Sequence, residues 1–465
     1  MRGLGVAAVV LSLVGSVACR PGAPLSQPEA DIAQAPRAIF LVTIDTLRAD
    51  HVHHLGYPRA TSPFLDRIAG SSVVFTRAYA ASSTTIASHA SLFTSLFPQQ
   101  HQMIRNGEEL DPSVVTVAQT LSEAGWQSGG FTTVNFMESL DRGFDRFRVA
   151  DRYHGAATVV DWTLEWLNRI DTDRPVFVWV HLFDVHEWYK PENLDLDAVE
   201  RARGLAPYGE DLRDFIVAEH GADTSIFGDD EAFIDAINAY DGQLLSVDEQ
   251  LERLYRSVTD LGLNRGAVWI VTSDHGEGLG SHSFKGHGAE IYEEQIRVPL
   301  LVHAPAASLA ARRIGAVVRH VDIVPTILEL VSHEGLDQVF APRGISLAEV
   351  LRTVGRPLPA LSAYAQRREA DEMRLSRGWI PGDVHCLVTD RYKYIRRTEG
   401  RDQLFALDDD PLEAADLLGR GLPVGLEMRQ RLEAMFDEMS EQGRMLQRSD
   451  INPEYIEQLK ALGYL

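Results

Sequence analysis

Short apolar runs that stop at polar residues are the most regular feature of the chain. Four runs of strand length are AIFLVTI (38–44), PVFVWVHLF (175–183), GAVWIVTSD (266–274) and RVPLLVHAP (297–305). Runs of this kind are typical of strands buried on both faces. Residues 114–124 have helical spacing and end at Gly125, which commonly terminates a helix. Alternating strands and helices predict an α/β fold with a doubly wound, mostly parallel sheet.

The hydrophobic pattern changes later in the chain. Residues 191–240 carry many acidic side chains and few strand signals, which indicates a helical insertion or lid. Residues 385–411 alternate around a Glu-Gly pair as a β-hairpin does, and a long helix is expected from Gly425. We therefore predict a main domain over 38–350 and a smaller lobe, with an antiparallel sheet and a terminal helix, over 351–465.

The first residues have the pattern of an export signal. Arg2 precedes an apolar run over 4–17, which is too short to cross a bilayer as a helix. The following SVAC is similar to a bacterial lipoprotein processing site, although serine stands where leucine is usual; an ordinary cleaved signal is the alternative. We expect a signal peptide over 1–19, a flexible tether over 20–37 and a lipid-anchored protein of the bacterial cell envelope, attached through Cys19 and facing the periplasm or the surface.

Charge and cysteine content narrow the function classes. The net charge of −23 argues against unaided nucleic-acid binding, because phosphate backbones need a positive surface. An anionic small substrate remains compatible, since a metal ion reverses the local field. We see no other segment that could span a membrane, so membrane contact is expected only through Cys19. Cys386 is the one remaining cysteine, so the processed chain has no intramolecular disulfide.

Metal-binding side chains follow two of the predicted strands. Asp45 comes directly after the first run, and Asp274 and His275 stand at the end of the third. Ligands of doubly wound sheets bind beyond the carboxyl ends of the strands. Carboxylates with one imidazole suit a divalent cation, although a single aspartate there would more simply cap a helix. Together these strand ends predict a metal site.

Several ordered motifs carry a resemblance to a known family. They are DTLRADH, SHASLFTSLFP, GFDRF, SDHGEGLGSH, GHGAEIYEEQIRVPLLV and YKYIRRTEGRDQLFALDDDPLEAADLL. From residue 38 to the closing LKALGYL, the chain resembles the sulfatase family of the alkaline-phosphatase-like superfamily. The resemblance implies a mixed sheet flanked by helices, a small C-terminal lobe and metal-dependent ester hydrolysis. It also implies one divalent cation, which is Ca²⁺ in the family. The imidazole of His275 favours Mn²⁺ or Zn²⁺ instead, and Mg²⁺ is a further alternative.

The hydroxyl-rich stretch STTIASHASLFTSLFP (83–98) holds the candidate nucleophile. The resemblance places Thr85 where sulfatases carry a cysteine or serine that is oxidised to formylglycine, and threonine is not a substrate of that oxidation. Thr85 is therefore itself the candidate nucleophile and a metal ligand, because a cation and a helix N-terminus both stabilise an alkoxide. Helix capping by Thr84 or Thr85 is the alternative. His89 replaces the family's arginine and is the candidate anion-binding residue.

Two histidines complete the expected site by resemblance. His186 in HLFDVHEWY and His287 in FKGHG would protonate the leaving group or bind the oxyanion. A purely structural imidazole is the alternative for each. A further alternative is a second zinc ion held by Asp184, His186, His282 and His287.

Three positions depart from the family pattern. Thr46 replaces a second aspartate, and Thr133 and Asn135 stand at the sulfate-contacting Lys and His positions. These changes weaken a sulfate-ester assignment more than they weaken the fold. We predict a metal-dependent sulfatase-family hydrolase that cleaves a sulfate ester of a small molecule, glycan or lipid through a threonine nucleophile. The alternatives are a phosphodiester or phosphonate-ester hydrolase or phosphoryl transferase of the same superfamily, and a non-catalytic envelope protein that binds anionic glycans.

Overall fold

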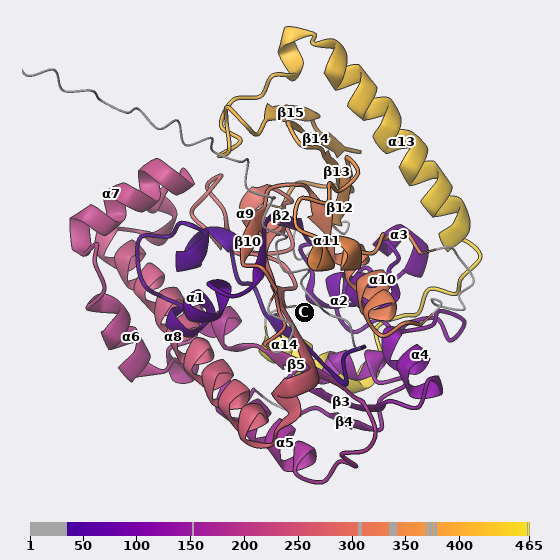
Figure 1. Cartoon of the computed structure of the whole chain (residues 1–465). Coiled ribbons are helices and arrows are strands. Elements are labelled where there is room, and N and C mark those ends of the chain that lie inside the picture. Colours follow the sequence, from indigo (N-terminus) through magenta and orange to yellow (C-terminus); the bar gives the residue numbers. More distant parts are fainter. Residues whose placement is uncertain are drawn as a thin grey trace, which may run out of the picture.

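The computed structural model describes residues 35–150, 153–305, 309–333, 342–367, 370, 375, 379–462 and 464. The predicted signal peptide, Cys19 and most of the predicted tether lie outside the described residues. The described chain has an α/β architecture with one large mixed sheet and one small antiparallel sheet (Figure 1). Within this part of the chain, no helix is both long and apolar enough to cross a bilayer.

The large sheet has nine strands in the order β10-β2-β9-β6-β1-β5-β3-β4, with β11 paired to β2. The strands are β1 (Ala38–Ile44), β2 (Val73–Tyr79), β3 (Gln127–Phe131), β4 (Arg146–Arg148), β5 (Val176–Leu182), β6 (Ala267–Ser273), β9 (Arg297–His303), β10 (Arg312–Ile314) and β11 (Val318–Arg319). β1 pairs in parallel with β5 and β6, whereas β9 runs antiparallel to β2 and β6. The four predicted strands and the doubly wound sheet are confirmed, and β9 is what makes the sheet mixed.

Helices cover both faces of the large sheet (Figure 1). They are α1 (Pro63–Ala69), α2 (Thr85–Thr94), α3 (Pro98–His101), α4 (Val117–Glu123), α5 (Ala156–Leu167), α6 (Leu196–Arg203), α7 (Gly209–His220), α8 (Asp230–Asp260), α9 (Glu293–Ile296), α10 (Ile323–Leu330) and α11 (Ala348–Arg352). The predicted helix over 114–124 is α4, and α6, α7 and the start of α8 make the segment 191–240 helical, as expected.

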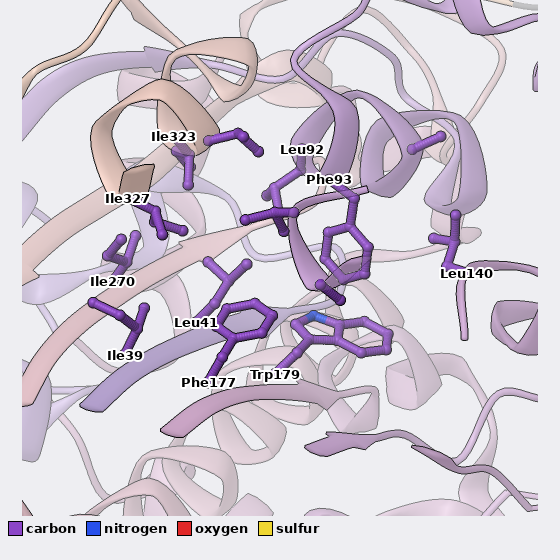
Figure 2. Close-up of a cluster of buried hydrophobic side chains, with 14 of the residues drawn as sticks. Ile39, Leu41, Leu92, Phe93, Leu140, Phe177, Trp179, Ile270, Ile323 and Ile327 are labelled. Atoms are coloured by element: carbon purple, nitrogen blue, oxygen red, sulfur yellow. The ribbon is translucent and has the colours of Figure 1, made fainter. Parts of the chain in front are cut away.

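Strand residues alternate between two cores, as the two-residue period of a strand requires. Leu41 of β1 packs with residues of α2 and α10, whereas the adjacent Val42 packs with residues of α5 and α8. Figure 2 shows Leu92 and Phe93 of α2 above the sheet, and the ring of Phe93 meets Trp179 of β5 edge-on at 5.1 Å. Burying a side chain of this size stabilises the fold by about 1.5–3 kcal/mol. Helix α2 is thereby fixed over the carboxyl ends of β1 and β5.

The smaller sheet lies at one end of the molecule and is covered by a long helix (Figure 1). Its strands are β12 (Ala363–Arg367), β13 (Val384–Val388), β14 (Tyr392–Arg397) and β15 (Gln403–Ala406), all antiparallel, followed by α13 (Pro423–Gly443). The predicted hairpin with its Glu-Gly turn is β14–β15, and Gly400 in that turn has φ 109°. The predicted long helix begins at Pro423, two residues before Gly425.

The chain then returns to the large core. The 3-10 helix η10 (Pro453–Tyr455) and helix α14 (Ile456–Ala461) place Tyr455, Leu459 and Leu462 in the same apolar cluster as α2 and α4. In Figure 1, α14 lies away from the small sheet. The predicted smaller lobe, 351–465, thus includes a last segment that packs on the main domain.

Candidate active site

The site is built where β1 and β6 end side by side. The two strands pair in parallel with Ile44 opposite Ser273, so Asp45 and Asp274 emerge next to each other. One ligand atom from each of Asp45, Asp274 and His275 lies within 4.8 Å of the others, and all three side chains are buried. The structure therefore brings together these three metal-ligand candidates, and the fourth, Thr85, has its Oγ1 3.3 Å from His275 Nε2.

The backbone holds these carboxylates tightly. Thr46 has φ 55°, which is rare for a β-branched residue, and its N–H donates to Asp274 Oδ1 at 3.1 Å. Its carbonyl accepts the Tyr240 hydroxyl at 2.7 Å. After His275, a Cβ on Gly276 would lie 1.9 Å from the carbonyl oxygen of Glu294, so only glycine fits there.

The electrostatics of this cluster fit a divalent cation. Both carboxylate oxygens of Asp45 and Oδ2 of Asp274 accept no hydrogen bond from the described residues. Burial and the neighbouring Asp274 charge raise the pKa of Asp45 well above its ordinary value. Burial also acts to raise the pKa of Asp274, but His275 and two other imidazoles reverse this and lower it. Unpaired buried carboxylates beside one imidazole are suitable ligands for Mn²⁺, Zn²⁺, Ca²⁺ or Mg²⁺.

His181 at the end of β5 is a further ligand candidate. Its Nε2 lies 3.2 Å from Asp45 Oδ2 and makes no hydrogen bond there, while its Nδ1 is 3.0 Å from the Thr43 hydroxyl. The ring nitrogen therefore faces the same point as the unpaired carboxylate oxygens. His181 belongs to the predicted strand over 175–183, but the sequence gave it no role.

Thr85 is the first residue of α2, a helix that is buried along its whole length. Its Oγ1 lies 3.3 Å from His275 Nε2, where the positive end of the helix dipole favours negative charge. The capping alternative does not fit this geometry. The N-cap residue Thr84 makes no side-chain capping bond, and the Ile86 N–H donates instead to Asn106 Oδ1 at 3.1 Å.

The anion-binding role expected for His89 is not supported by its surroundings. Its Nδ1 donates to the Thr85 carbonyl at 2.8 Å, and its Nε2 is 3.0 Å from the Thr43 hydroxyl. Burial and the nearby His181 lower the pKa of His89 to about 3, so the ring is neutral. A neutral imidazole with both nitrogens engaged has no donor left for an anion. His89 instead braces the first turn of α2 against β1.

His186 and His287 face each other in the pocket beside Thr85, with ring centroids 5.0 Å apart. Each has a glutamate behind it: His186 Nδ1 is 2.9 Å from Glu187 Oε1, and His287 Nδ1 is 3.3 Å from Glu277 Oε2. Burial acts to raise the pKa of each glutamate, but its histidine partner contributes to a net lowering. A carboxylate at Nδ1 orients Nε2 toward the pocket. Both histidines thus have the arrangement that the predicted proton-transfer role needs.

A pocket of about 450 Å³ opens over these histidines. Lys285 lies on its rim with Nζ 5.2 Å from the ring of Trp188 and 5.0 Å from that of Phe227. The combination of a cation and aromatic walls suits an anionic ester with a ring-shaped alcohol group. The lining residues are Thr84, Asn106, His186, Trp188, Tyr189, Glu277, Phe284, Lys285, Gly286, His287, Gly288, Trp379, Leu462 and Tyr464.

The four residues of the second-zinc alternative do not form a metal-binding group in the described chain. Asp184 Oδ1 accepts the Ala156 N–H at 2.8 Å, at the start of α5. His282 Nδ1 pairs with Glu294 Oε1 at 2.9 Å, and the His282 ring stacks on the ring of Tyr292. The second-zinc interpretation is therefore wrong for this arrangement.

Thr133 and Asn135 do not line the pocket. They lie between β3 and the 3-10 helix η3 (Asn135–Leu140), where the Asn135 N–H donates to Gln458 Oε1 and Gln458 Nε2 donates to the Thr133 carbonyl at 3.3 Å. Gln458 belongs to α14, so this loop is a docking point for the last segment of the chain. That segment brings Tyr464 into the pocket.

Besides His181, sequence reasoning missed five residues of the site, for different reasons. Glu187 directly follows His186 and Glu277 stands in the same DHGEG motif as His275, so their positions carried a signal. Nothing local in the sequence connects the other three to the site; they are Asn106, Lys285 and Tyr464.

A carboxylate pair at the ends of β1 and β6, with the hydroxyl of Thr85 and the imidazoles of His186 and His287 nearby, provides the groups that ester hydrolysis needs. The sequence profile of the Sulfatase family matches residues 37–333. The chain therefore belongs to the sulfatase family, and the predicted fold and enzyme class are confirmed.

Individual relatives agree with this assignment. The chain is 23% identical over 432 residues to an ulvan-active sulfatase of Formosa agariphila, with 83% of this chain and 77% of the relative covered. It is similar in fold, with a TM-score of 0.67 and 19% identity, to a phosphonate monoester hydrolase of Agrobacterium radiobacter, covering 87% of this chain and 96% of that one. It is also similar, with a TM-score of 0.70 and 18% identity, to a structure from work on glycosaminoglycan metabolism by Bacteroides thetaiotaomicron, covering 92% and 99%.

Proposed function

We propose that this protein hydrolyses a sulfate ester with Thr85 as the nucleophile. The observation that carries the proposal is the position of Thr85 Oγ1: it lies at the N-terminus of a buried helix, 3.3 Å from His275, and does not serve as a helix cap. Asp45, Asp274, His275 and Thr85 would hold one divalent cation, with His181 beside them. Such a cation supplies Lewis-acid stabilisation of negative charge on the ester oxygens.

The remaining steps follow from residues of the chain. Thr85 Oγ1 gives its proton to a base in the pocket and attacks the sulfur in line with the leaving alcohol, forming a threonine sulfate ester as the original S–O bond breaks. His186 or His287, held by its glutamate, gives a proton to the leaving oxygen. The same imidazole then takes a proton from water as the water oxygen attacks the sulfur. The bond between sulfur and Thr85 Oγ1 breaks, the base returns its proton to Thr85, and sulfate leaves.

Phosphonate-ester or phosphodiester hydrolysis is the second candidate. It is favoured by the likeness to the phosphonate monoester hydrolase and by Thr133, Asn135 and His89, none of which offers a side chain to the pocket. A phosphoryl transfer to an acceptor alcohol would use the same nucleophile. A glycan-binding protein without catalysis would have no use for unpaired carboxylates aligned with Thr85, so we place it last.

The leaving alcohol is proposed to be a sugar or another ring. Support comes from the aromatic walls of the pocket, including Trp188 and Tyr189, and from the glycan in the name of the ulvan-active relative. Export and attachment through Cys19 stay part of the proposal, because that segment is outside the described residues.

The test is a substrate panel with the protein starting at residue 37. Nitrophenyl sulfate, nitrophenyl phosphate, the bis-nitrophenyl diester and a phenylphosphonate ester are offered with each divalent cation to wild type, Thr85→Ala and Thr85→Ser. Thr94→Ala, at the far end of the same helix, is the matched control. We expect sulfate turnover that is lost in Thr85→Ala, retained in part in Thr85→Ser and kept in the control. Turnover of only the phosphorus esters would favour the second candidate, and activity that survives Thr85→Ala would contradict the nucleophile.

A further inference from the structure

The last segment of the chain is firmly docked beside the active site. Gln458 of α14 bonds the loop at Thr133, and Leu459 is buried in the main core. Toward the pocket, Lys190 Nζ donates to the Ala461 carbonyl at 3.2 Å and the Tyr189 hydroxyl to the Leu462 carbonyl at 3.4 Å. These contacts connect the segment to the 3-10 helix η4 (Asp184–Tyr189), which carries His186, and to the residue after it.

Tyr464 is the residue that this docking places in the site. Its backbone N–H donates to the Leu459 carbonyl at 2.8 Å, and its ring meets Phe136 edge-on at 5.8 Å. These contacts fix the direction of the side chain. Its hydroxyl then lies between the nucleophile and both catalytic histidines: 3.5 Å from Thr85 Oγ1, 3.0 Å from His186 Nε2 and 3.3 Å from His287 Nε2.

The partners of His186 determine which group accepts the hydroxyl proton of Tyr464. His186 Nδ1 faces the Glu187 carboxylate at 2.9 Å and must donate to it, so Nε2 of the neutral ring is an acceptor. The phenol therefore donates its one proton to His186 Nε2, its shortest contact. Its lone pairs are left to accept a hydrogen bond from the Thr85 hydroxyl. A tyrosine phenol is ordinarily protonated near neutral pH, so Tyr464 has a proton to give.

We propose that Tyr464 is a catalytic residue that carries the proton of the Thr85 hydroxyl to His186. As Thr85 Oγ1 bonds to the ester's sulfur or phosphorus, its proton moves to the phenol oxygen while the phenol proton moves to His186 Nε2. The imidazolium, paired with Glu187, gives this proton to the leaving oxygen as the ester bond breaks. Protons and charges balance, and Tyr464 ends the step as a phenol.

This inference rests on the proposed function, because it takes Thr85 as the nucleophile. It goes further by assigning the base that Thr85 otherwise lacks. His275 Nε2 is nearer to Thr85, but it belongs to the group that would hold the cation and is not free to take a proton. Tyr464 connects Thr85 to His186, a proton acceptor that does not belong to the cation-binding group.

The test compares Tyr464→Phe with Tyr455→Phe in the protein starting at residue 37. Both changes remove one hydroxyl from the same segment, but Tyr455 lies in the core and not in the pocket. With an ester whose leaving alcohol needs a proton, such as a phenyl or sugar ester, we expect kcat of Tyr464→Phe to fall about 100- to 10,000-fold, the range of general acid–base catalysis, with KM little changed. With the nitrophenyl ester, kcat of Tyr464→Phe should fall by a smaller factor. Tyr455→Phe should have the kcat of wild type with both esters.

A double-mutant cycle with His186→Gln identifies the relay. If the two residues act in one chain, Tyr464→Phe should cost little more once His186 is gone. If Tyr464 had only a structural role, Tyr464→Phe would slow the turnover of both esters equally. It would also lower the activity by the same factor whether or not His186 is present. Equal or faster turnover by Tyr464→Phe would overturn the inference while leaving the proposed function intact. Absence of turnover in wild type would overturn both, so the two failures are distinguishable.

Discussion

Replacing Asp45 by asparagine separates the cost of its buried charge from its use as a metal ligand. Ligand atoms of Asp45 and Asp274 lie within 4.8 Å, and no described donor bonds either oxygen of Asp45. Two charges at that distance repel by about 3 kcal/mol at an effective dielectric constant of about 20. Without a cation, Asp45→Asn should therefore be more stable than wild type by up to that amount at a pH where both carboxylates are ionised.

When a cation is bound, the difference in stability between wild type and Asp45→Asn should change. A ligand at about 100 times its Kd stabilises the folded state by about 2.7 kcal/mol. For 465 residues that unfold cooperatively, an unfolding entropy of about 2.1 cal/mol/K per residue makes this a rise of about 3 °C in Tm. Wild type should show this rise on titration with Mn²⁺, Zn²⁺, Ca²⁺ or Mg²⁺, and Asp45→Asn should lose most of it because a neutral amide replaces a charged ligand.

The assay is thermal unfolding at pH 8 with chelator and with each cation in turn. Asp248→Asn is the matched control, since Asp248 is also buried but accepts the N–H groups of Phe64 and Leu65 at 2.6 and 3.0 Å. Its cation-dependent shift should equal that of wild type. The reasoning would be refuted by an Asp45→Asn variant that is less stable than wild type in chelator, or that keeps the full cation shift.

Three further outcomes are expected. Burial acts to lower the pKa of His282, but Glu294 raises it, and His282 in turn helps to lower the pKa of Glu294 against its burial. The ion pair therefore stabilises the fold between the ordinary pKa values of 4.5 and 6.5, and this stabilisation is lost as the pH rises further. His282→Gln should lower the free energy of unfolding, measured with urea, by about 1–3 kcal/mol near pH 6 and by less at pH 9. A loss of stability that does not change with pH would contradict the ion pair. Lys393→Met should cost about 3–5 kcal/mol, because it leaves the buried Glu413 carboxylate, 3.0 Å away, unpaired; an unchanged urea midpoint would refute this. Burial raises the pKa of Cys386 to about 12, so its thiol should resist alkylation at pH 8 until denaturant is added, and rapid labelling of the native protein would contradict its burial.

The main sheet could be predicted because its strands are continuous apolar runs that end at polar residues. The burial of β1 on both faces and the strand-end positions of Asp45 and Asp274 follow from local sequence alone. Thr85 could be located only through its resemblance to a family motif, since nothing local separates a nucleophile from a helix cap. Its unused capping geometry, with Asn106 in that place, required the structure.

The incorrect and missing parts of the site depend on long-range packing. His89 stands at a family anion-binding position, but its ring points into the protein because Thr43 and the Thr85 carbonyl hold both nitrogens. Tyr464 is 379 residues from Thr85 in sequence and reaches it only because the segment that contains α14 packs into the main core. No periodicity or spacing encodes such a contact.

The most direct test of the central claim is the mass of the protein during turnover. Wild type mixed with a nitrophenyl ester and quenched in acid at early times is digested, and the peptide that contains Thr85 is weighed and sequenced by mass spectrometry. We expect that peptide to gain one sulfuryl group, or one phosphoryl group if the second candidate holds, with the added mass on Thr85. An active enzyme whose added mass lies on another residue would contradict the assignment of Thr85 as the nucleophile.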